Sequence, residues 1–371
     1  MGYWVDIENP YVTYEPKYIE SVWNLIQKLY KKNLIYKGYT IQPYSPAAGT
    51  GLSSHELNLP GCYKSVKDTS VVALFELEGK KKKRFKTDFS VYFLAWTTTP
   101  WTLPANTGLA VGEKIEYLII ETFNPYTTEK ITVILAKDRL FSFFKKEFLK
   151  ESLDGELFNP KKLSYSVIGS VFGKDLLGLK YKQLLNFCEP CFGKENAFFV
   201  VSGDFVNTDD GTGIVHMAPT FGADDKRVAE ENNIPPMLVL NKEKKPVPIV
   251  NEQGRYVSSL SCFGGRFVKK EYDDDKKNEA LDVDIAVFLK KGGKAFRVEK
   301  YEHNYPHCWR TDKPVLYYPL SSWFIKTTKH KKNLLDFNDK INWFPQSTGV
   351  GRFKNWLQNL NDWNLSRSRF W

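Results

Sequence analysis

Two segments of this chain of 371 residues combine residue types that could do chemistry. The first, WTTTPWTLPAN at residues 96–106, leaves a strand-like run and breaks at a proline. Its candidate ligand-binding residues are Trp96, Thr97, Thr98, Thr99 and Trp101. Threonine hydroxyls at the exit of a strand suit a polar ligand such as a ribose or an ester, and tryptophans supply flat apolar walls. Threonines are also ordinary strand residues, and composition alone leaves that interpretation open.

The second segment, GTGIVHMAPTFGADD, covers residues 211–225. Its candidates are two glycines that let the backbone approach a ligand, a histidine that ends a strand and two aspartates that open a helix: Gly211, Gly213, His216, Asp224 and Asp225. A carboxylate in a first helical turn is favoured by ~0.3–1 kcal/mol through the helix dipole alone, so either aspartate could be purely structural. A lone histidine is likewise more often a satisfied, partly buried residue than a catalytic base. Neither segment by itself identifies a reaction.

Short strands surround these two segments. β-Branched and aromatic residues between turn signals predict strands at 70–78, 90–97, 108–111, 116–121, 130–136, 197–202, 213–217 and 236–240. Helical patches are predicted at 138–150 and 223–232. Runs so short and so mixed predict a mixed α/β, barrel-like module with mostly antiparallel or mixed strands and peripheral helices, rather than regular βαβ repetition.

Composition divides the chain into four expected parts, at 1–38, 39–69, 70–297 and 298–371. Residues 17–36 have the apolar spacing of a helix with one apolar face. Another part of the protein must cover that face. Residues 39–69 are rich in Gly, Pro and Ser and predict a connector. The last part should pack its large apolar side chains Trp343, Trp356, Trp363 and Trp371. Its abrupt end indicates a segment cut from a longer polypeptide.

The composition also excludes several classes of protein. Hydrophobic residues make up 42% and aromatic residues 15%, which excludes a disordered or collagen-like chain. There is no run of about 18 apolar residues and no signal-peptide pattern, so we expect neither a membrane nor a secretory protein. The 53 Lys and Arg residues against 43 Asp and Glu residues give a net charge of +10, which suits a partner that carries phosphates.

Five cysteines, an odd count on a long chain, indicate a reducing, cytoplasmic setting rather than a disulfide scaffold. Cys188 and Cys191 have the spacing of a metal knuckle. A tetrahedral site needs four ligands, however, and no second Cys-x-x-Cys or His pair follows at zinc-ribbon distance, so we expect no metal. The alternative is a Cys/His metal module that uses Cys188, Cys191, Cys262 and Cys308.

Taken together, the two segments are far more specific than either alone. WTTTPWTLPAN followed by GTGIVHMAPTFGADD resembles the editing domain, also called connective polypeptide 1, of the isoleucyl-tRNA synthetase family. MGYWVDIENPY at the start, YPHCWRTDKPV at 305–315, and NWL followed by DWNLSRSRFW at the end resemble the catalytic-domain edges into which that domain is inserted. The resemblance implies an editing domain at 70–297 between two such edges. Valyl- and leucyl-tRNA synthetase editing domains are a poorer match, because they usually have Arg at the place of Thr99 and no His at that of His216.

The resemblance implies post-transfer editing, in which the ester of tRNA(Ile) mischarged with valine is hydrolysed at the 3′ acceptor end. Asp225 would bind the protonated α-amino group through charge-assisted hydrogen bonds, with its neighbour Asp224 as the alternative. Thr97, Thr98 and Thr99 would line the ester, the terminal adenosine and a hydrolytic water. The residues implied to help hold the site are Asn106 and the backbone of Gly211, Thr212 and Gly213.

A second site is implied because isoleucine exceeds valine by one methylene. Such a difference is worth only ~1–3 kcal/mol to an attractive pocket, a general magnitude for which isoleucyl-tRNA synthetase itself is the standard example. The editing site would therefore reject the larger side chain by collision, with Thr99 and His216 as walls. Whether His216 is instead a general base stays open, although the resemblance favours the wall.

The chain lacks the HIGH-type and KMSKS-type signatures of adenylate-forming class I synthetases, so we expect no amino-acid activation from it. Editing itself would need no cofactor, whereas the full-length synthetase uses ATP. The implied partners are tRNA(Ile), the valine moiety and the remainder of the synthetase. The alternatives are a module that binds the tRNA acceptor end without turnover, and the editing domain of a valyl or leucyl synthetase.

Overall fold

The computed structural model describes residue 4 and residues 6–79, 84–274 and 280–367. The chain forms two compact units, Met1–Thr40 with Leu320–Trp371, and Ile41–Pro319. The strands β1 (Ile35–Ser45) and β14 (Leu316–Ile325) each run from one unit into the other. The second unit includes residues 41–69 and 298–319, which we expected in the connector and in the C-terminal flank. The first three residues of the N-terminal motif, its fifth residue and the last four residues of the chain, Trp371 among them, lie outside the described residues.

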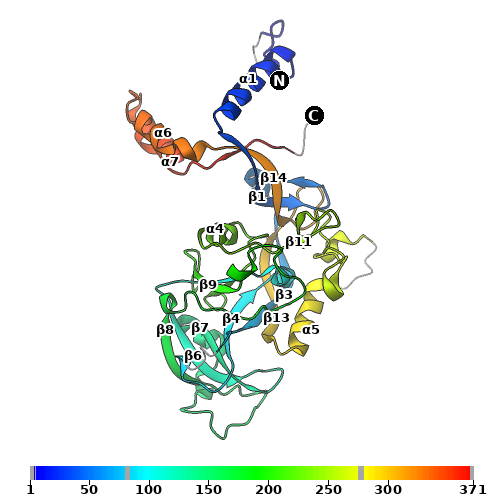
Figure 1. The fold of residues 1–371 in the computed structure, drawn as a ribbon, viewed down its shortest axis with the longest axis vertical. Coiled ribbons are helices and arrows are strands. Elements are labelled where there is room, and N and C mark those ends of the chain that lie inside the picture. The colour runs from blue at the N-terminus through cyan, green and yellow to red at the C-terminus, as the bar shows by residue number, and fades with distance from the viewer. Residues whose placement is uncertain (1–3, 5, 80–83, 275–279, 368–371) are drawn as a thin grey trace. The chain divides into compact units, whose positions relative to one another are not determined.

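A six-stranded sheet is the framework of the second unit (Figure 1). In spatial order its strands are β13 (Ala295–Pro306), β3 (Tyr63–Glu76), β4 (Val91–Thr97), β7 (Lys130–Ala136), β6 (Glu116–Phe123) and β8 (Ser166–Phe172). Neighbouring strands are antiparallel, except that β4 and β7 run parallel. Thr97 is the last residue of β4 and pairs with Val71 of β3. The threonine segment therefore leaves the sheet from an interior strand.

A smaller three-stranded sheet contains the strand of the second segment. Its spatial order is β10 (Ile214–Met217), β5 (Gly108–Val111) and β9 (Phe199–Ser202), with β10 antiparallel and β9 parallel to β5. Two short pairs complete the second unit, β11 (Leu238–Leu240) with β12 (Pro246–Pro248), and β2 (Thr50–Gly51) with the end of β1.

Helices lie around these sheets. The second unit has α2 (Ser54–Leu57), α3 (Leu140–Phe143), α4 (Ala223–Glu231) and α5 (Leu281–Lys291), and a 3-10 helix, η2 (Pro100–Ala105), follows β4. α5 contacts β3, β13 and η2. Among the described residues, no helix has the length and apolar character needed to cross a membrane.

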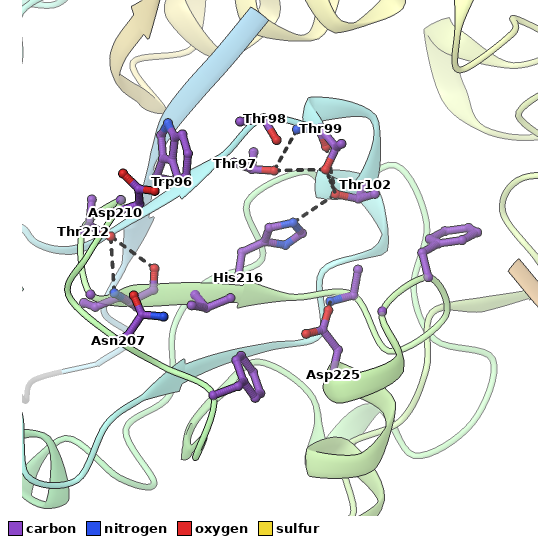
Figure 2. Close-up of a pocket in the computed structure, with 18 residues that line it drawn as sticks. Trp96, Thr97, Thr98, Thr99, Thr102, Asn207, Asp210, Thr212, His216 and Asp225 are labelled. Carbon is purple, nitrogen blue, oxygen red and sulfur yellow. Dashed lines mark hydrogen bonds between the residues drawn. The ribbon is translucent and has the colours of Figure 1, made fainter. Parts of the chain in front are cut away.

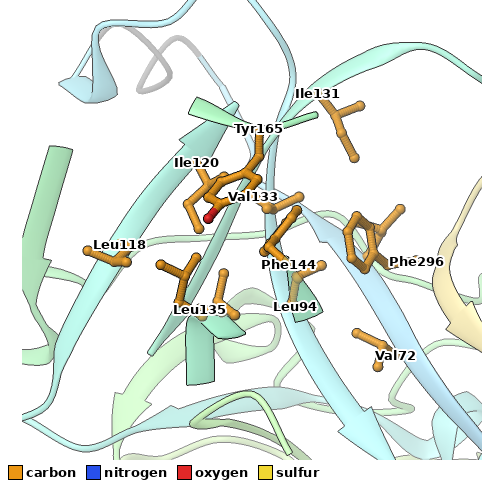
Figure 3. Close-up of a cluster of buried hydrophobic side chains, with 12 residues drawn as sticks. Val72, Leu94, Leu118, Ile120, Ile131, Val133, Leu135, Phe144, Tyr165 and Phe296 are labelled. Carbon is orange, nitrogen blue, oxygen red and sulfur yellow. The ribbon is translucent and has the colours of Figure 1, made fainter. Parts of the chain in front are cut away.

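A cluster of buried apolar side chains holds the large sheet together (Figure 3). It consists of Val72, Leu74, Leu94, Leu118, Ile120, Ile131, Val133, Leu135, Leu140, Phe144, Tyr165 and Phe296. Alternate residues of β6 and β7 contribute, as expected for one face of a sheet. The Phe144 ring lies 4.7 Å from that of Tyr165 and 5.8 Å from that of Phe296, measured between centroids. Because burying one large apolar side chain stabilises a fold by ~1.5–3 kcal/mol, this cluster fixes β4 firmly.

The first unit contains α1 (Pro16–Lys31), α6 (Lys331–Asn338), α7 (Lys354–Gln358) and β15 (Trp363–Asn364), which pairs with β14. None of the residues of α1 is buried, and Trp23 and Tyr30 are exposed. The two side chains line an apolar groove of about 750 Å³ within this unit. The expected packing of the C-terminal tryptophans is partial, because Trp343 and Trp356 both pack on Phe353 but Trp356 and Trp363 stay half exposed.

The expected mixed α/β class with peripheral helices is confirmed, and β5 and β7 have the predicted bounds. Among the described residues the sheets stay open, so they form no closed barrel. The helix predicted at 17–36 is wrong beyond Lys31, because Asn33 adopts a left-handed φ of 55° and β1 begins at Ile35.

The segment 39–69, which we predicted as a connector, is largely extended. It contains the end of β1 and the start of β3, which pairs with β13 from Tyr63–Pro306 to Ala73–Ala295. Long-range backbone hydrogen bonds therefore override the local turn signals. The helical patch predicted at 138–150 contains only α3 and short 3-10 turns, since Phe144 already adopts an extended conformation.

Candidate active site

The two segments singled out in the sequence converge on one pocket of about 410 Å³ (Figure 2). The threonines come from the end of β4 and the start of η2, and the opposite side comes from β10 and the first turn of α4. The lining residues are Trp96, Thr97, Thr98, Thr99, Thr102, Phe205, Asn207, Asp210, Gly211, Thr212, Gly213, Ile214, Val215, His216, Ala218, Phe221, Gly222 and Asp225.

Contacts between the two sheets bring the segments together. The Thr212 hydroxyl donates to the Leu94 carbonyl of β4 at 2.6 Å, and the Ala136 N–H donates to the Thr212 carbonyl at 2.9 Å. The Tyr117 hydroxyl of β6 donates to the Gly213 carbonyl at 2.7 Å. Gly213 has a φ of +74°, and a Cβ atom there would lie 2.4 Å from the Cβ of Ala136. Only glycine lets the backbone approach β7 this closely.

A chain of hydrogen bonds crosses one wall of the pocket. The Thr99 N–H donates to the Thr97 hydroxyl at 3.1 Å. The Thr102 hydroxyl donates to the Thr99 carbonyl at 2.8 Å and lies 3.0 Å from Nε2 of His216. A hydroxyl has one proton, and its use in the bond from Thr102 to the Thr99 carbonyl favours the tautomer in which Nε2 of His216 donates to Thr102. The side chains of β4 and η2 are thereby joined to β10.

His216 is a neutral imidazole with a polar neighbour at each ring nitrogen. With Nε2 protonated, Nδ1 is an acceptor, and it lies 3.5 Å from Nδ2 of Asn106. Asn106 is oriented in turn, since it receives the Tyr181 hydroxyl on Oδ1 at 2.6 Å and donates to the Gly108 carbonyl at 2.8 Å. Burial lowers the pKa of His216 to about 4, so the ring is uncharged at pH 7.

Asp225 supplies a carboxylate on the other side of the pocket. It lies in the first turn of α4, and its Oδ2 accepts the Ala218 N–H at 2.8 Å. Burial raises the pKa of Asp225 to about 6, the Ala218 bond opposes this shift and Asp224 adds to it. At pH 7 the carboxylate is therefore mainly ionised. A Cβ atom at Gly222 would lie 2.4 Å from Oδ2 of Asp225, so glycine leaves the space that the carboxylate occupies.

Asp224, the neighbouring aspartate, points to solvent. Its side chain is 72% exposed and lies 4.0 Å from the guanidinium of Arg227, three residues further along α4. A surface ion pair of this kind contributes little stability. Of the two aspartates that open the helix, only Asp225 lines the pocket.

Two of the expected site residues lie behind the surface of the pocket. Trp101 is 3% exposed and packs edge-on against Phe221 with the centroids 5.2 Å apart, so its ring supports the lining instead of forming it. Asn106 lies behind His216. The other expected residues all line the pocket: Trp96, Thr97, Thr98, Thr99, Gly211, Thr212, Gly213, His216 and Asp225.

Sequence reasoning missed several lining residues. Thr102 stands three positions after Thr99, and in a 3-10 helix residues i and i+3 lie on the same side, so this spacing could have revealed it. Phe205, Asn207 and Asp210 come from the loop before Gly211. No periodic pattern marks them, because only the pairing of β10 with β5 places that loop beside the threonines.

The cysteine pair offers poor metal ligands. Burial raises the pKa of the Cys188 thiol to about 11, and Glu189 adds to the shift, so the thiolate that a metal needs is disfavoured. All five cysteines are free thiols. In the part of the chain that the structure describes, no three His, Cys, Asp or Glu side chains gather as a metal site.

The hydrogen-bond chain predicts the tautomer of His216. In a protein labelled with 15N-histidine, the nitrogen shifts of His216 should show a neutral, Nε2-protonated ring between pH 5 and 8. In Thr102→Val the acceptor for Nε2 is lost without a large change in volume, so the tautomer preference should weaken. The signals of His216 would be assigned by their loss in the spectrum of His216→Gln. Titration of the ring near pH 6.5, or a proton on Nδ1, would contradict this prediction.

Comparisons with known proteins agree with the resemblance in the motifs. The model of the family described as tRNA synthetases class I (I, L, M and V) matches residues 1–371. The chain is 55% identical over 383 residues to the isoleucine–tRNA ligase of Cytophaga hutchinsonii, an alignment that covers 100% of this chain and 34% of that protein. It is 53% identical over 391 residues to the isoleucine–tRNA ligase of Porphyromonas gingivalis, with the same shares covered.

The chain thus spans about a third of the length of the curated relatives it matches. Among solved structures, the editing domain of the Plasmodium knowlesi cytosolic leucyl-tRNA synthetase is 10% identical with a TM-score of 0.41, and the match covers 63% of this chain and 97% of that chain. The family match, in contrast, runs along the whole sequence, and the chain belongs to the class I tRNA synthetases of the isoleucine, leucine, methionine and valine group.

Proposed function

We propose that this chain is the editing part of an isoleucyl-tRNA synthetase and hydrolyses the ester of Val-tRNA(Ile). The observation that carries the proposal is the arrangement of one pocket of about 410 Å³, in which the carboxylate of Asp225 lies across from the hydroxyls of Thr97, Thr98 and Thr99. The identity of 55% to an isoleucine–tRNA ligase over the whole chain supports the choice of tRNA.

Asp225 binds the protonated α-amino group of the aminoacyl ester. An ionised carboxylate makes strong, short hydrogen bonds to an ammonium, and partial burial strengthens the attraction because water screens it less. One oxygen of Asp225 accepts the Ala218 N–H, so the side chain is already oriented before the substrate enters. The amino group then fixes the position of the ester relative to the wall of threonines.

The threonine wall positions the ester and a water molecule for hydrolysis. The water oxygen forms a new bond to the ester carbon, the bond from that carbon to the ribose oxygen breaks, and a proton passes to the ribose oxygen. The products are free valine and a tRNA with a free terminal hydroxyl. The protein contributes mainly position and hydrogen-bond donors for the charge that develops on the carbonyl oxygen, since fixed groups need no reorganisation during the reaction.

Thr99, Thr102 and His216 set the size limit of the pocket. Their mutual hydrogen bonds join β4, η2 and β10, so the wall cannot yield to a larger side chain without breaking them. His216 acts as a wall rather than a general base, because both ring nitrogens face partners and burial lowers its pKa to about 4. Isoleucine is rejected by collision.

The partners follow from this assignment. The 3′ acceptor end of tRNA(Ile) brings the ester to the pocket, and ATP belongs to the ligase reaction of the complete synthetase. Residues 1–38 and 298–371 are the edges of the catalytic domain, and the remainder of the synthetase covers the apolar side chains that α1 exposes. The protein works in the cytoplasm, where aminoacyl-tRNA is made and used.

The proposal is tested by deacylation of Val-tRNA(Ile) and Ile-tRNA(Ile) with the 371-residue chain and with the complete synthetase. We expect release of valine but not of isoleucine, and near-complete loss of valine release in Asp225→Ala, with Asp224→Ala as the matched control that keeps it. If the folded protein binds tRNA but releases no valine in either form, the chain is an acceptor-end binding module. Normal turnover by Asp225→Ala would remove this residue from the site.

Removal of the imidazole should widen the pocket. In His216→Ala we expect hydrolysis of Ile-tRNA(Ile) to rise by roughly 10–200-fold, the factor that one methylene is worth in such a pocket. His216→Gln retains most of the volume and should keep the preference for valine. Loss of all hydrolysis in both variants, with tRNA binding intact, would show instead that His216 is a general base.

The pH dependence of Val-tRNA(Ile) hydrolysis should reflect the titration of Asp225 and not that of His216. Since the pKa of Asp225 is about 6 and its ionised form binds the ammonium, kcat/KM for Val-tRNA(Ile) should fall as the pH drops through about 6. His216 stays neutral until about pH 4, so His216→Gln should keep the same acidic limb. An acidic limb that vanishes in His216→Gln would contradict the assignment.

A further inference from the structure

A buried cluster of charged side chains lies next to the threonine wall, outside the pocket itself. Lys269 and Asp282 are each 6% exposed, with Lys269 Nζ 3.6 Å from Oδ2 of Asp282. The same ammonium lies 3.0 Å from Oδ2 of Asp68 on β3 and 4.7 Å from the centroid of the Tyr305 ring. Asp282 comes from the first turn of α5, and the proposed hydrolysis gives none of these side chains a role.

Asp282 holds the backbone of the segment that carries the threonines. Its second oxygen, Oδ1, accepts the N–H of Trp101 at 2.9 Å. Trp101 lies at the start of η2, where the first N–H groups of a helix have no partner within the helix. The carboxylate therefore satisfies a buried donor that would otherwise be unpaired.

The same residue is also held at its carbonyl. The Tyr256 hydroxyl donates to the Trp101 carbonyl at 2.5 Å, and Tyr256 is 1% exposed. Two side chains from distant parts of the sequence thus fix both backbone polar groups of Trp101. The neighbours of Trp101 include Thr99 and Thr102, which form the wall of the pocket together with His216.

We propose that Asp282, held by Lys269, and Tyr256 are positioning residues that set the size limit of the pocket by fixing the backbone of Trp101 between Thr99 and Thr102. The inference deepens the proposed editing function and rests on it. Neither side chain lines the pocket, so their effect passes through η2 to the hydroxyls of Thr99 and Thr102 and to the imidazole that Thr102 contacts.

The charge balance of the cluster supports a positional role. Burial raises the pKa of Asp282 to about 6, although Lys269 opposes that shift. Burial acts to lower the pKa of Lys269, but Asp282, Tyr305 and Asp68 outweigh it and raise the pKa above its usual range. Both groups are therefore charged at pH 7. Buried ion pairs seldom add much net stability, whereas removal of one partner leaves an uncompensated charge, so such a pair is better suited to fixing a geometry.

The test measures the ratio of kcat/KM for Val-tRNA(Ile) to that for Ile-tRNA(Ile) in the complete synthetase. In Asp282→Ala we expect this ratio to fall by roughly 10–100-fold, because a displaced wall would admit the one extra methylene of isoleucine, a difference worth ~1–3 kcal/mol. Asp282→Asn retains an oxygen for the Trp101 N–H and should restore most of the ratio. The matched control is Asp284→Ala, which removes another acidic residue of α5 and its ion pair with Arg266 at 2.6 Å, and should leave the ratio unchanged.

Tyr256→Phe, which removes a single hydroxyl, is a second variant for the same measurement. It should also lower the ratio of the two kcat/KM values. If Asp282→Ala does not fold, as judged by circular dichroism and thermal unfolding, the result for Tyr256→Phe alone tests the inference. Unchanged ratios in folded Tyr256→Phe and Asp282→Ala, or an equal loss in Asp284→Ala, would overturn the inference. Failure of the parent protein to release valine would count against the proposed function instead, so the two failures are distinguishable.

Discussion

The contact between the two sheets at Thr212 and Gly213 is the constraint on which the pocket depends. Here the start of β10 comes close enough to β4, β6 and β7 for side-chain and backbone hydrogen bonds, and the approach needs a residue without Cβ at position 213. The large sheet fixes Thr97 and its neighbours, while the small sheet fixes His216. Without this junction the two segments would belong to separate surfaces, and neither contains a complete site.

Burial acts on Asp225 and His216, two of the titratable groups that line the pocket, in opposite senses. It raises the pKa of Asp225 to about 6 and lowers that of His216 to about 4, because it disfavours whichever form is charged. Near pH 7 the result is one negative charge on the α4 side and an uncharged ring on the β10 side. The substrate that we propose, with an ammonium group and an uncharged side chain, matches the charges of Asp225 and His216.

The residues of the site were more predictable than the fold that positions them. The strands β5 and β7 follow from local β-branched runs, which predict their bounds. Half of the lining residues were also predicted, because they cluster in two short motifs. The strand β13 and the first half of β3 were missed, since their pairing joins residues more than 200 positions apart and their local composition resembles loops. Trp101 was expected to line the pocket, but its apolar ring is more stable behind Phe221, away from water.

Asp282 illustrates why the residues that support such a site escape sequence reasoning. Its position in the first turn of α5 has an ordinary explanation in the helix dipole, as have the positions of Asp224 and Asp225, and only the folded structure separates the three. The size limit that we propose requires a wall that resists deformation, and hydrogen bonds to both the N–H and the carbonyl of Trp101 hold the backbone beside that wall. The buried polar groups that hold this backbone, Asp282 and Tyr256, are brought to it by the fold from segments remote in the sequence.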